Sequence, residues 1–117
     1  MMFIKTFPDE IELLAFFESE PIVNEVGDLH FAYKIEDNNG MEMVFSFCAT
    51  AGWIKTLIKF KGKEISKYLS ENIGEIRLKR DSLGEYLHTE VITDDLITNI
   101  EIRVRPDISI KSTSLVR

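Results

Sequence analysis

The stretch from residue 28 to residue 60, DLHFAYKIEDNNGMEMVFSFCATAGWIKTLIKF, decides the fold of this chain. Apolar and polar side chains alternate along residues 29–35, 41–50 and 53–60, and a period of two is typical of β-strands that bury one face. The DNNG sequence at 37–40 favours a hairpin, because these residue types tolerate the positive φ angles of tight turns. The stretch therefore predicts three consecutive antiparallel strands.

A helix is predicted before these strands. Thr6 is a candidate N-cap residue, and Pro8 falls in the first turn, where the missing N–H of proline does no harm. Phe16 and Phe17 belong to a broad apolar helix face, which we expect to pack on the sheet. The helix is expected to run to about residue 19.

The remaining segments are shorter and less regular. Apolar side chains recur at helical spacing in residues 64–73, and the glycine that follows is suited to end a helix, so a second short helix is predicted there. Alternation predicts strands elsewhere. We expect a loop at 21–28, strands at 75–80, 85–93 and 99–105, a final short strand at 108–111 and a fraying end at 112–117.

The predicted fold class is α+β. Tight turns join the predicted strands and favour antiparallel pairing, because parallel neighbours need crossovers of a dozen residues or more. We therefore expect a curved antiparallel β meander of five to seven strands, with the N-terminal helix packed on one face. A length of 117 residues is enough for one core, so residues 1–117 are predicted to form a single domain.

Composition indicates an ordinary globular protein, with 44% hydrophobic and 29% charged residues. The apolar runs are far shorter than the roughly 20 residues of a membrane helix, and the N-terminus does not resemble a signal peptide. The single cysteine, Cys48, forms no internal disulfide, which agrees with a reducing compartment. We expect a cytoplasmic protein.

The net charge of −6 is unevenly distributed. Residues 1–28 and residues 81–101 each carry a net charge of −6, whereas residues 43–80 carry +5. Such blocks are either solvated faces or an acidic surface that steers a basic partner. The candidate partner-binding carboxylates are Glu10, Glu12, Glu18, Glu20, Glu25 and Asp28 in the first acidic block, and Glu85, Glu90, Asp94 and Asp95 in the second.

Catalytic chemistry finds little support in the sequence. Neither His30 nor His88 has the spacing of a metal site. His88 and Glu90 are expected on one strand face, where a His–Glu pair can act as general acid and base, but an ordinary exposed face is the favoured interpretation. Cys48 is expected in the core. We therefore predict no enzyme, no catalytic residue, no cofactor and no metal.

Nucleic-acid binding is a further alternative, because lysines and aromatic residues interleave between residues 53 and 68. The acidic balance of the whole chain argues against it. Trp53 is expected in the core, with an exposed anchor in a protein interface as the alternative. The lysines are Lys55, Lys59, Lys61, Lys63 and Lys67, and the aromatic residues are Trp53, Phe60 and Tyr68.

In size, charge and strand pattern the whole chain resembles the immunity proteins of bacterial contact-dependent inhibition and related polymorphic toxin systems. The resemblance includes FPD at 7–9, MVFSF at 43–47 and DSLG at 81–84. It implies a non-catalytic cytoplasmic domain that binds and neutralises one cognate toxin. Many such toxins are nucleases with basic clefts, and an acidic partner gains association rate from complementary fields. An oligonucleotide-binding domain and an assembly subunit that pairs through a sheet edge remain the alternatives.

Overall fold

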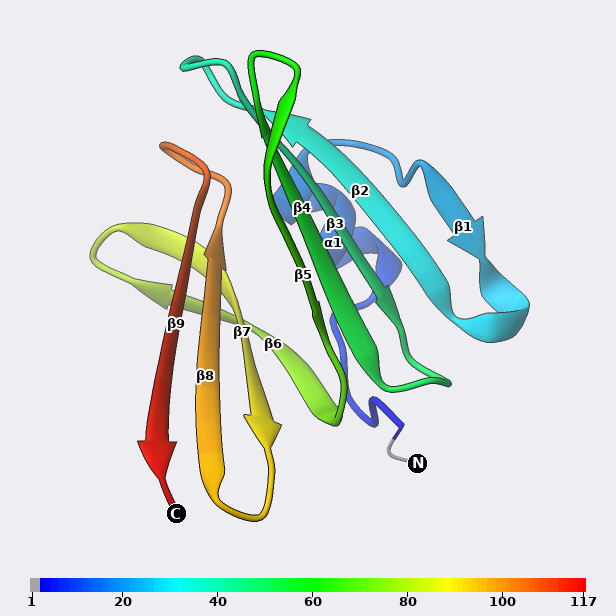
Figure 1. Cartoon of the computed structure of the whole chain (residues 1–117). Coiled ribbons are helices and arrows are strands. Elements are labelled where there is room, and N and C mark those ends of the chain that lie inside the picture. The colour runs from blue at the N-terminus through cyan, green and yellow to red at the C-terminus, as the bar shows by residue number, and fades with distance from the viewer. Residues whose placement is uncertain (1–2) are drawn as a thin grey trace.

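The computed structural model describes residues 3–117 as two antiparallel β-sheets and one α-helix (Figure 1). Within each sheet, every strand pairs with the next strand in sequence, so each sheet is a meander. The first sheet consists of β1 (Val23–Glu25), β2 (His30–Glu36), β3 (Met41–Cys48), β4 (Trp53–Phe60) and β5 (Lys63–Ser70), and the second of β6 (Ile73–Asp81), β7 (Gly84–Ile92), β8 (Leu96–Arg103) and β9 (Ser109–Val116). The predicted β-rich fold with a helix is confirmed, but its nine strands form two meanders instead of one of five to seven strands.

The three strands predicted from residues 28–60 are β2, β3 and β4, and their antiparallel pairing is confirmed. Phe47 near the end of β3 pairs with Phe31 on one side and Ile54 on the other. Phe47 and Ile54 are fully buried, so this row of side chains faces the core. The alternation of apolar residues thus placed the inner face correctly.

The short helix predicted at 64–73 is wrong, because residues Lys63–Ser70 form strand β5. This segment pairs with β4 along its length, with one register shift between Ile58 and Lys59. Ile65 and Leu69, which suggested a helical face, are more than half exposed. Pairing with β4 satisfies the backbone of the segment and overrides its weak local helical pattern.

The ends of the chain are also more ordered than predicted. The strands expected at 75–80, 85–93 and 99–105 correspond to β6, β7 and β8 with shifted bounds. Strand β9 includes most of the segment expected to fray, since it pairs with the whole of β8. The expected loop at 21–28 contains β1 and a 3₁₀ turn, η1 (Val26–Asp28).

Helix α1 spans Glu10–Phe17, and its cap is Asp9 instead of Thr6. The Asp9 carboxylate accepts from the Glu12 N–H at 2.8 Å, and the Glu12 carboxylate accepts from the Asp9 N–H at 3.0 Å. This reciprocal pair is a capping box, which satisfies two N–H groups that a helix start leaves free. The helix ends before residue 19, because Glu18 adopts a left-handed conformation with φ of 54°.

The buried face of α1 packs on the first sheet, as predicted. Phe16 and Phe17 are buried, and the Phe17 ring stacks on the Tyr33 ring at 4.5 Å between centroids. Both sheets contribute to the same hydrophobic cluster, in which Phe45 of β3 and Ile102 of β8 are members. The helix is therefore held against a core that the two sheets share.

The N-terminal segment links the two sheets. The Ile4 N–H donates to the Ala49 carbonyl at 2.9 Å, after the end of β3. Two residues later, the Thr6 carbonyl accepts from the Ile76 N–H at 2.8 Å, and Thr6 forms a parallel bridge to Glu75 in β6. Backbone hydrogen bonds from one short segment thus reach both sheets.

Asp37 forms a second link between the sheets. One carboxylate oxygen accepts from the N–H groups of Asn39 and Met41 in the β2–β3 turn. The other oxygen accepts from the Ile108 N–H at 3.1 Å, just before β9. Asp37 therefore closes its own turn and attaches it to the second sheet.

We predict that Asp37→Ala lowers the free energy of unfolding by about 1–3 kcal/mol, because it leaves partly buried N–H groups without an acceptor. Urea unfolding followed by circular dichroism measures this change. Asn38→Ala, an exposed neighbour in the same turn, is the control and should stay near the wild-type value. Equal stability of the two variants would contradict the role assigned to Asp37.

Candidate functional site

The residues considered for catalysis do not form a catalytic arrangement. The Nε2 atom of His88 lies 2.9 Å from the side-chain oxygen of Asn99, so the His88 ring pairs with an amide and not with Glu90. Cys48 is buried, as expected, and its Sγ lies 3.5 Å from the Thr50 hydroxyl. Within residues 3–117, no three His, Cys, Asp or Glu side chains gather closely enough to hold a metal ion.

The outer face of the first sheet carries His30 and Trp53. The His30 ring meets Trp53 edge-on at 5.3 Å, and its Nδ1 lies 3.4 Å from Glu25. Trp53 is half-buried there and is not part of the shared core. The expectation that Trp53 lies in the core is therefore wrong. Because Glu25 is already close to His30, its carboxylate is less available to a partner than a free one.

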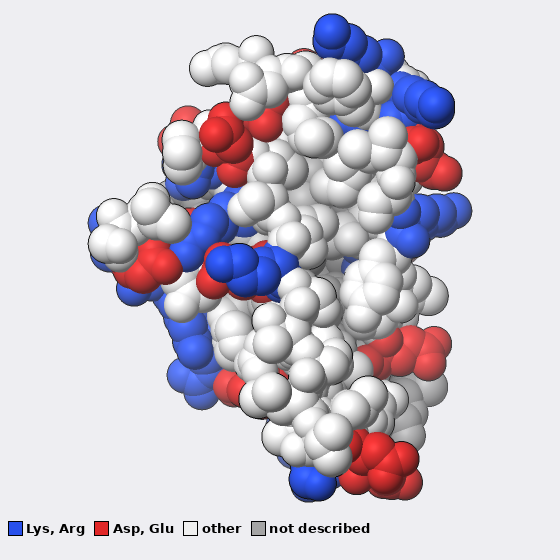
Figure 2. Space-filling view, turned by 60° about the vertical axis from the view of Figure 1, so that its left-hand side comes forward, with Lys and Arg blue, Asp and Glu red and all other residues white. Residues whose placement is uncertain are grey.

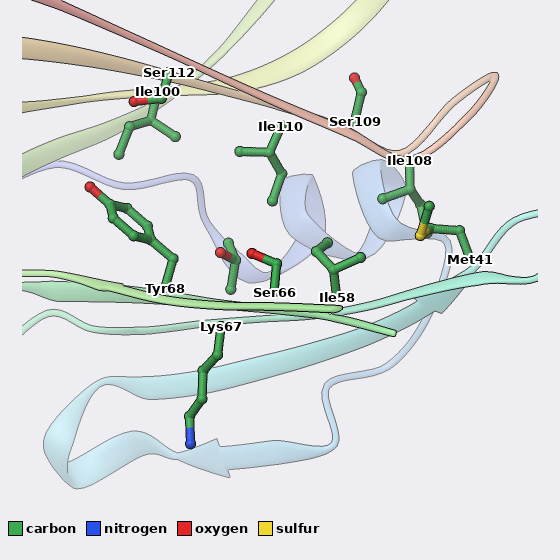
Figure 3. Close-up of a pocket in the computed structure, with 11 residues that line it drawn as sticks. Met41, Ile58, Ser66, Lys67, Tyr68, Ile100, Ile108, Ser109, Ile110 and Ser112 are labelled. Atoms are coloured by element: carbon green, nitrogen blue, oxygen red, sulfur yellow. The ribbon is translucent and has the colours of Figure 1, made fainter. Parts of the chain in front are cut away.

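The lysine-rich stretch does not form one basic stacking surface. Lys67 and Tyr68 are neighbours in β5, and their side chains point to opposite sides of the sheet (Figure 3). Tyr68 faces the space between the sheets, whereas Lys67 points away from it. The rings and cations that a single strand of nucleic acid would contact are therefore separated at this point.

That space is a groove of about 430 Å³ between the β5 and β9 edges (Figure 3). Its walls are mainly aliphatic side chains such as Ile58, Ile100 and Ile110, with hydroxyl groups of serine, threonine and Tyr68. No carboxylate or imidazole is among its lining residues. Lys67, although it lines the groove, points away from it, so the groove offers aliphatic side chains and hydroxyl groups.

A smaller cleft of about 160 Å³ lies between the start of α1 and the β1–η1 segment. We call it the α1–β1 cleft. Its walls are largely apolar, and Glu10 contributes the one carboxylate. The lining residues are Phe7, Pro8, Glu10, Leu13, Pro21, Asn24, Val26, Phe31 and Tyr33.

Tyr33 is the most buried polar residue of this cleft, with 1% of its surface exposed. Its hydroxyl makes no side-chain hydrogen bond with the described residues, and it is not among their fully buried unpartnered atoms, so its oxygen still meets the solvent. Burial raises the pKa of Tyr33, and the Glu10 and Glu20 carboxylates raise it further. Glu10 and the Tyr33 phenol thus line one cleft.

The other carboxylates of the first acidic block have different surroundings. Glu12 belongs to the capping box, on the side of α1 that faces β6. Glu18 pairs with Arg105 at 3.2 Å, and Glu25 lies near His30 as described. Asp28 is exposed at the end of η1 and forms no ion pair with residues 3–117. Glu10, Glu20 and Asp28 are therefore the unpaired members of this block.

The second acidic block is spread along β7. Glu85 lies at its start, 4.0 Å from Arg80, whereas Asp94 and Asp95 follow its other end. A nine-residue strand spans about 30 Å, so these carboxylates do not form one cluster. Figure 2 shows acidic and basic side chains interspersed on the face in view. Glu90 lies near the N-terminal segment, beside Lys5.

One ionic cluster was missed by the sequence analysis. Arg103 of β8 is only 6% exposed, pairs with Asp81 and with Glu101 at 3.1 Å, and lies over the Tyr86 ring at 4.5 Å. The Arg103 hydrogen bond holds the pKa of the Asp81 carboxyl below its usual value. Alternation placed Arg103 on an outer face, and there Asp81 at the end of β6, Glu101 and the Tyr86 ring cover its guanidinium.

Apolar clefts beside free carboxylates form the kind of surface that protein interfaces use. The chain is similar, over 97% of its length and the whole of the matched chain, to a solved "Contact-dependent growth inhibition toxin - immunity protein complex from Klebsiella pneumoniae 342", with 42% sequence identity and a TM-score of 0.92. It belongs to the immunity proteins of contact-dependent growth inhibition systems, which confirms the resemblance stated from the sequence.

No protein-family model and no curated protein matches the chain. Among residues 3–117, no helix is long and apolar enough to cross a membrane.

We predict that Tyr33→Phe makes the stability of the protein less sensitive to high pH. The pKa of Tyr33 is raised above 10.0 in the folded state, so the unfolded chain ionises first and the wild type loses stability as pH rises above 10.0. The phenylalanine variant lacks this loss. Urea unfolding at neutral pH and at about pH 11 measures the difference.

Tyr68→Phe serves as the control, because Tyr68 is 44% exposed at the rim of the inter-sheet groove. The Tyr68 variant should follow the wild-type pH profile. Identical profiles for wild type and Tyr33→Phe would contradict the environment assigned to Tyr33.

Proposed function

We propose that this chain binds and neutralises the toxin of its own contact-dependent inhibition system, acting by occlusion and without catalysis or a cofactor. One observation carries the proposal, namely the whole-chain likeness to a toxin–immunity complex at 42% identity. We further propose that the toxin is a nuclease with a basic cleft, and that the chain acts in the cytoplasm as a single domain. These finer statements rest on the charge pattern and the composition of the chain.

We propose that the toxin binds at an acidic flank formed by α1, the β1 segment and η1. Its free carboxylates are Glu10, Glu20 and Asp28, as described above. Exposed apolar side chains lie beside them in the sequence, and Ile11 and Val26 are 77% and 68% exposed. Apolar contact area next to charge is typical of specific protein interfaces.

The first acidic block supports this role better than the second. In the first block, Glu10 lines the α1–β1 cleft, and the charges of Glu10 and Glu20 both raise the pKa of Tyr33. In the second block, Glu85 is close to Arg80 and lies a strand length away from Asp94. Potentials that are concentrated on one flank steer a basic partner more effectively than dispersed charges do.

The proposed mechanism is competition for the cationic surface of the toxin. Carboxylates of the acidic flank would occupy positions where a nuclease binds the phosphates of its substrate. Long-range attraction between the two surfaces would speed their encounter, and this attraction weakens with added salt. Glu12, Glu18 and Glu25 would add to the field of the flank, although each has a local partner.

We predict that the double charge reversal Glu10→Lys with Glu20→Lys slows association with the cognate toxin domain about tenfold or more at low salt and weakens the salt dependence of the association rate. Stopped-flow fluorescence at two salt concentrations measures both effects. The matched control is Asp94→Lys with Asp95→Lys, which changes the net charge equally but lies in the β7–β8 turn.

The control variant should associate at close to the wild-type rate. Unfolding of both variants is compared as well, because a lysine in the first turn of α1 opposes the helix dipole. Equal slowing by the two double variants would show that only net charge matters. Wild-type association by both would remove the acidic flank from the interface.

A further inference from the structure

We propose that the α1–β1 cleft receives one lysine or arginine side chain of the toxin, whose cationic group binds the Tyr33 hydroxyl and the Glu10 carboxylate. This inference rests on the proposed function and names the contact at the centre of the acidic flank. Three features of the cleft support it: its size, the phenol hydroxyl in its wall and the chemistry of its other lining residues.

The size of the cleft fits a side chain. Its volume of about 160 Å³ is below the roughly 300–1,000 Å³ of sites that hold drug-sized ligands. A cavity of about 150 Å³ is enough for a benzene-sized group. The cleft is therefore too small for a nucleotide and large enough for one extended side chain of a partner protein.

The phenol of Tyr33 provides a site for a hydrogen bond. Tyr33 is 1% exposed, lines the cleft and makes no side-chain hydrogen bond with the described residues. Its hydroxyl is not among their fully buried unpartnered side-chain atoms, so its oxygen still meets the solvent. A donor of a partner protein that enters the cleft can therefore bind this oxygen.

The negative charge at the cleft favours a cationic side chain over a neutral hydrogen-bond donor. A lysine or arginine in the cleft would donate to the phenol oxygen and lie beside the Glu10 carboxylate, whereas an acidic side chain would be repelled. The aliphatic stem of the cation would contact Leu13, Pro21 and Val26, as long basic side chains do when they lie along apolar surface.

The first test compares the affinities of Glu10→Gln, Tyr33→Phe and the control Glu12→Gln for the toxin domain of the same system, measured by isothermal titration calorimetry. Glu12→Gln removes the same charge from the same helix turn, and glutamine preserves the capping box. We expect Glu10→Gln and Tyr33→Phe each to weaken binding about tenfold or more, and Glu12→Gln to stay within about twofold.

The second test locates the cation. Each lysine and arginine of the toxin domain is replaced by methionine, and the variants are titrated against wild-type and Tyr33→Phe immunity protein. One toxin residue should show coupling, so that its replacement weakens binding to the wild type strongly but has little further effect with Tyr33→Phe. Replacements elsewhere should weaken both complexes equally.

The outcomes separate this inference from the proposed function. Tight wild-type binding with no loss in Glu10→Gln and Tyr33→Phe would overturn the cleft contact and leave toxin binding in place. Tight binding with no coupled toxin cation would likewise overturn it. Failure of the wild type to bind the toxin domain would overturn the proposed function and the inference together.

Discussion

The stack of Phe17 on Tyr33 is the contact on which the functional surface depends. It joins the last turn of α1 to the centre of β2, with 4.5 Å between the ring centroids. Phe16 contacts the Phe17 ring edge-on, so the end of the helix is fixed by a chain of aromatic contacts. Because the end of α1 is fixed, its first turn extends over the β2 face, and a cleft remains between that turn and the β1 segment.

The same packing explains why a polar group remains unpartnered in this cleft. Burial of the Tyr33 ring removes apolar area from water and favours the fold. Its hydroxyl still meets the solvent, and neither α1 nor β1 provides it with a side-chain partner. Exposed Val26 and half-buried Pro21 border the opening of the cleft. The fold thus leaves a hydrogen-bonding group in the wall of a cleft, where a partner can reach it.

Much of the fold could be predicted because alternation along residues 28–60 is a local property. The inner face of β2 to β4 and the hairpin at Asp37 follow from residue type and spacing alone. The division into two sheets does not, because it depends on whether β5 and β6 pair with each other or turn apart. Asn72, with φ of 63°, lies at the point where the chain leaves one sheet for the other.

The candidate site could likewise be predicted only as far as local sequence allows. Sequence identifies every carboxylate, but it does not show which ones have partners. Glu18 meets Arg105, far along the chain, and this pairing depends on the loop after β8. Tyr33 appeared in the sequence as one more inward residue of an alternating strand, and no local signal distinguishes a phenol with a partner from one without.

Two kinds of interaction on the acidic flank would act on different steps of binding, one on association and the other on dissociation. Exposed carboxylates act at a distance, so they govern how fast the partners meet and how strongly salt slows them. A desolvated contact in a cleft acts only after docking, so it governs how slowly the complex dissociates. Long-range attraction acts on any basic partner, whereas a cleft accepts a cation only at one position. Discrimination between toxins is therefore expected to depend on the lining of the α1–β1 cleft more than on net charge.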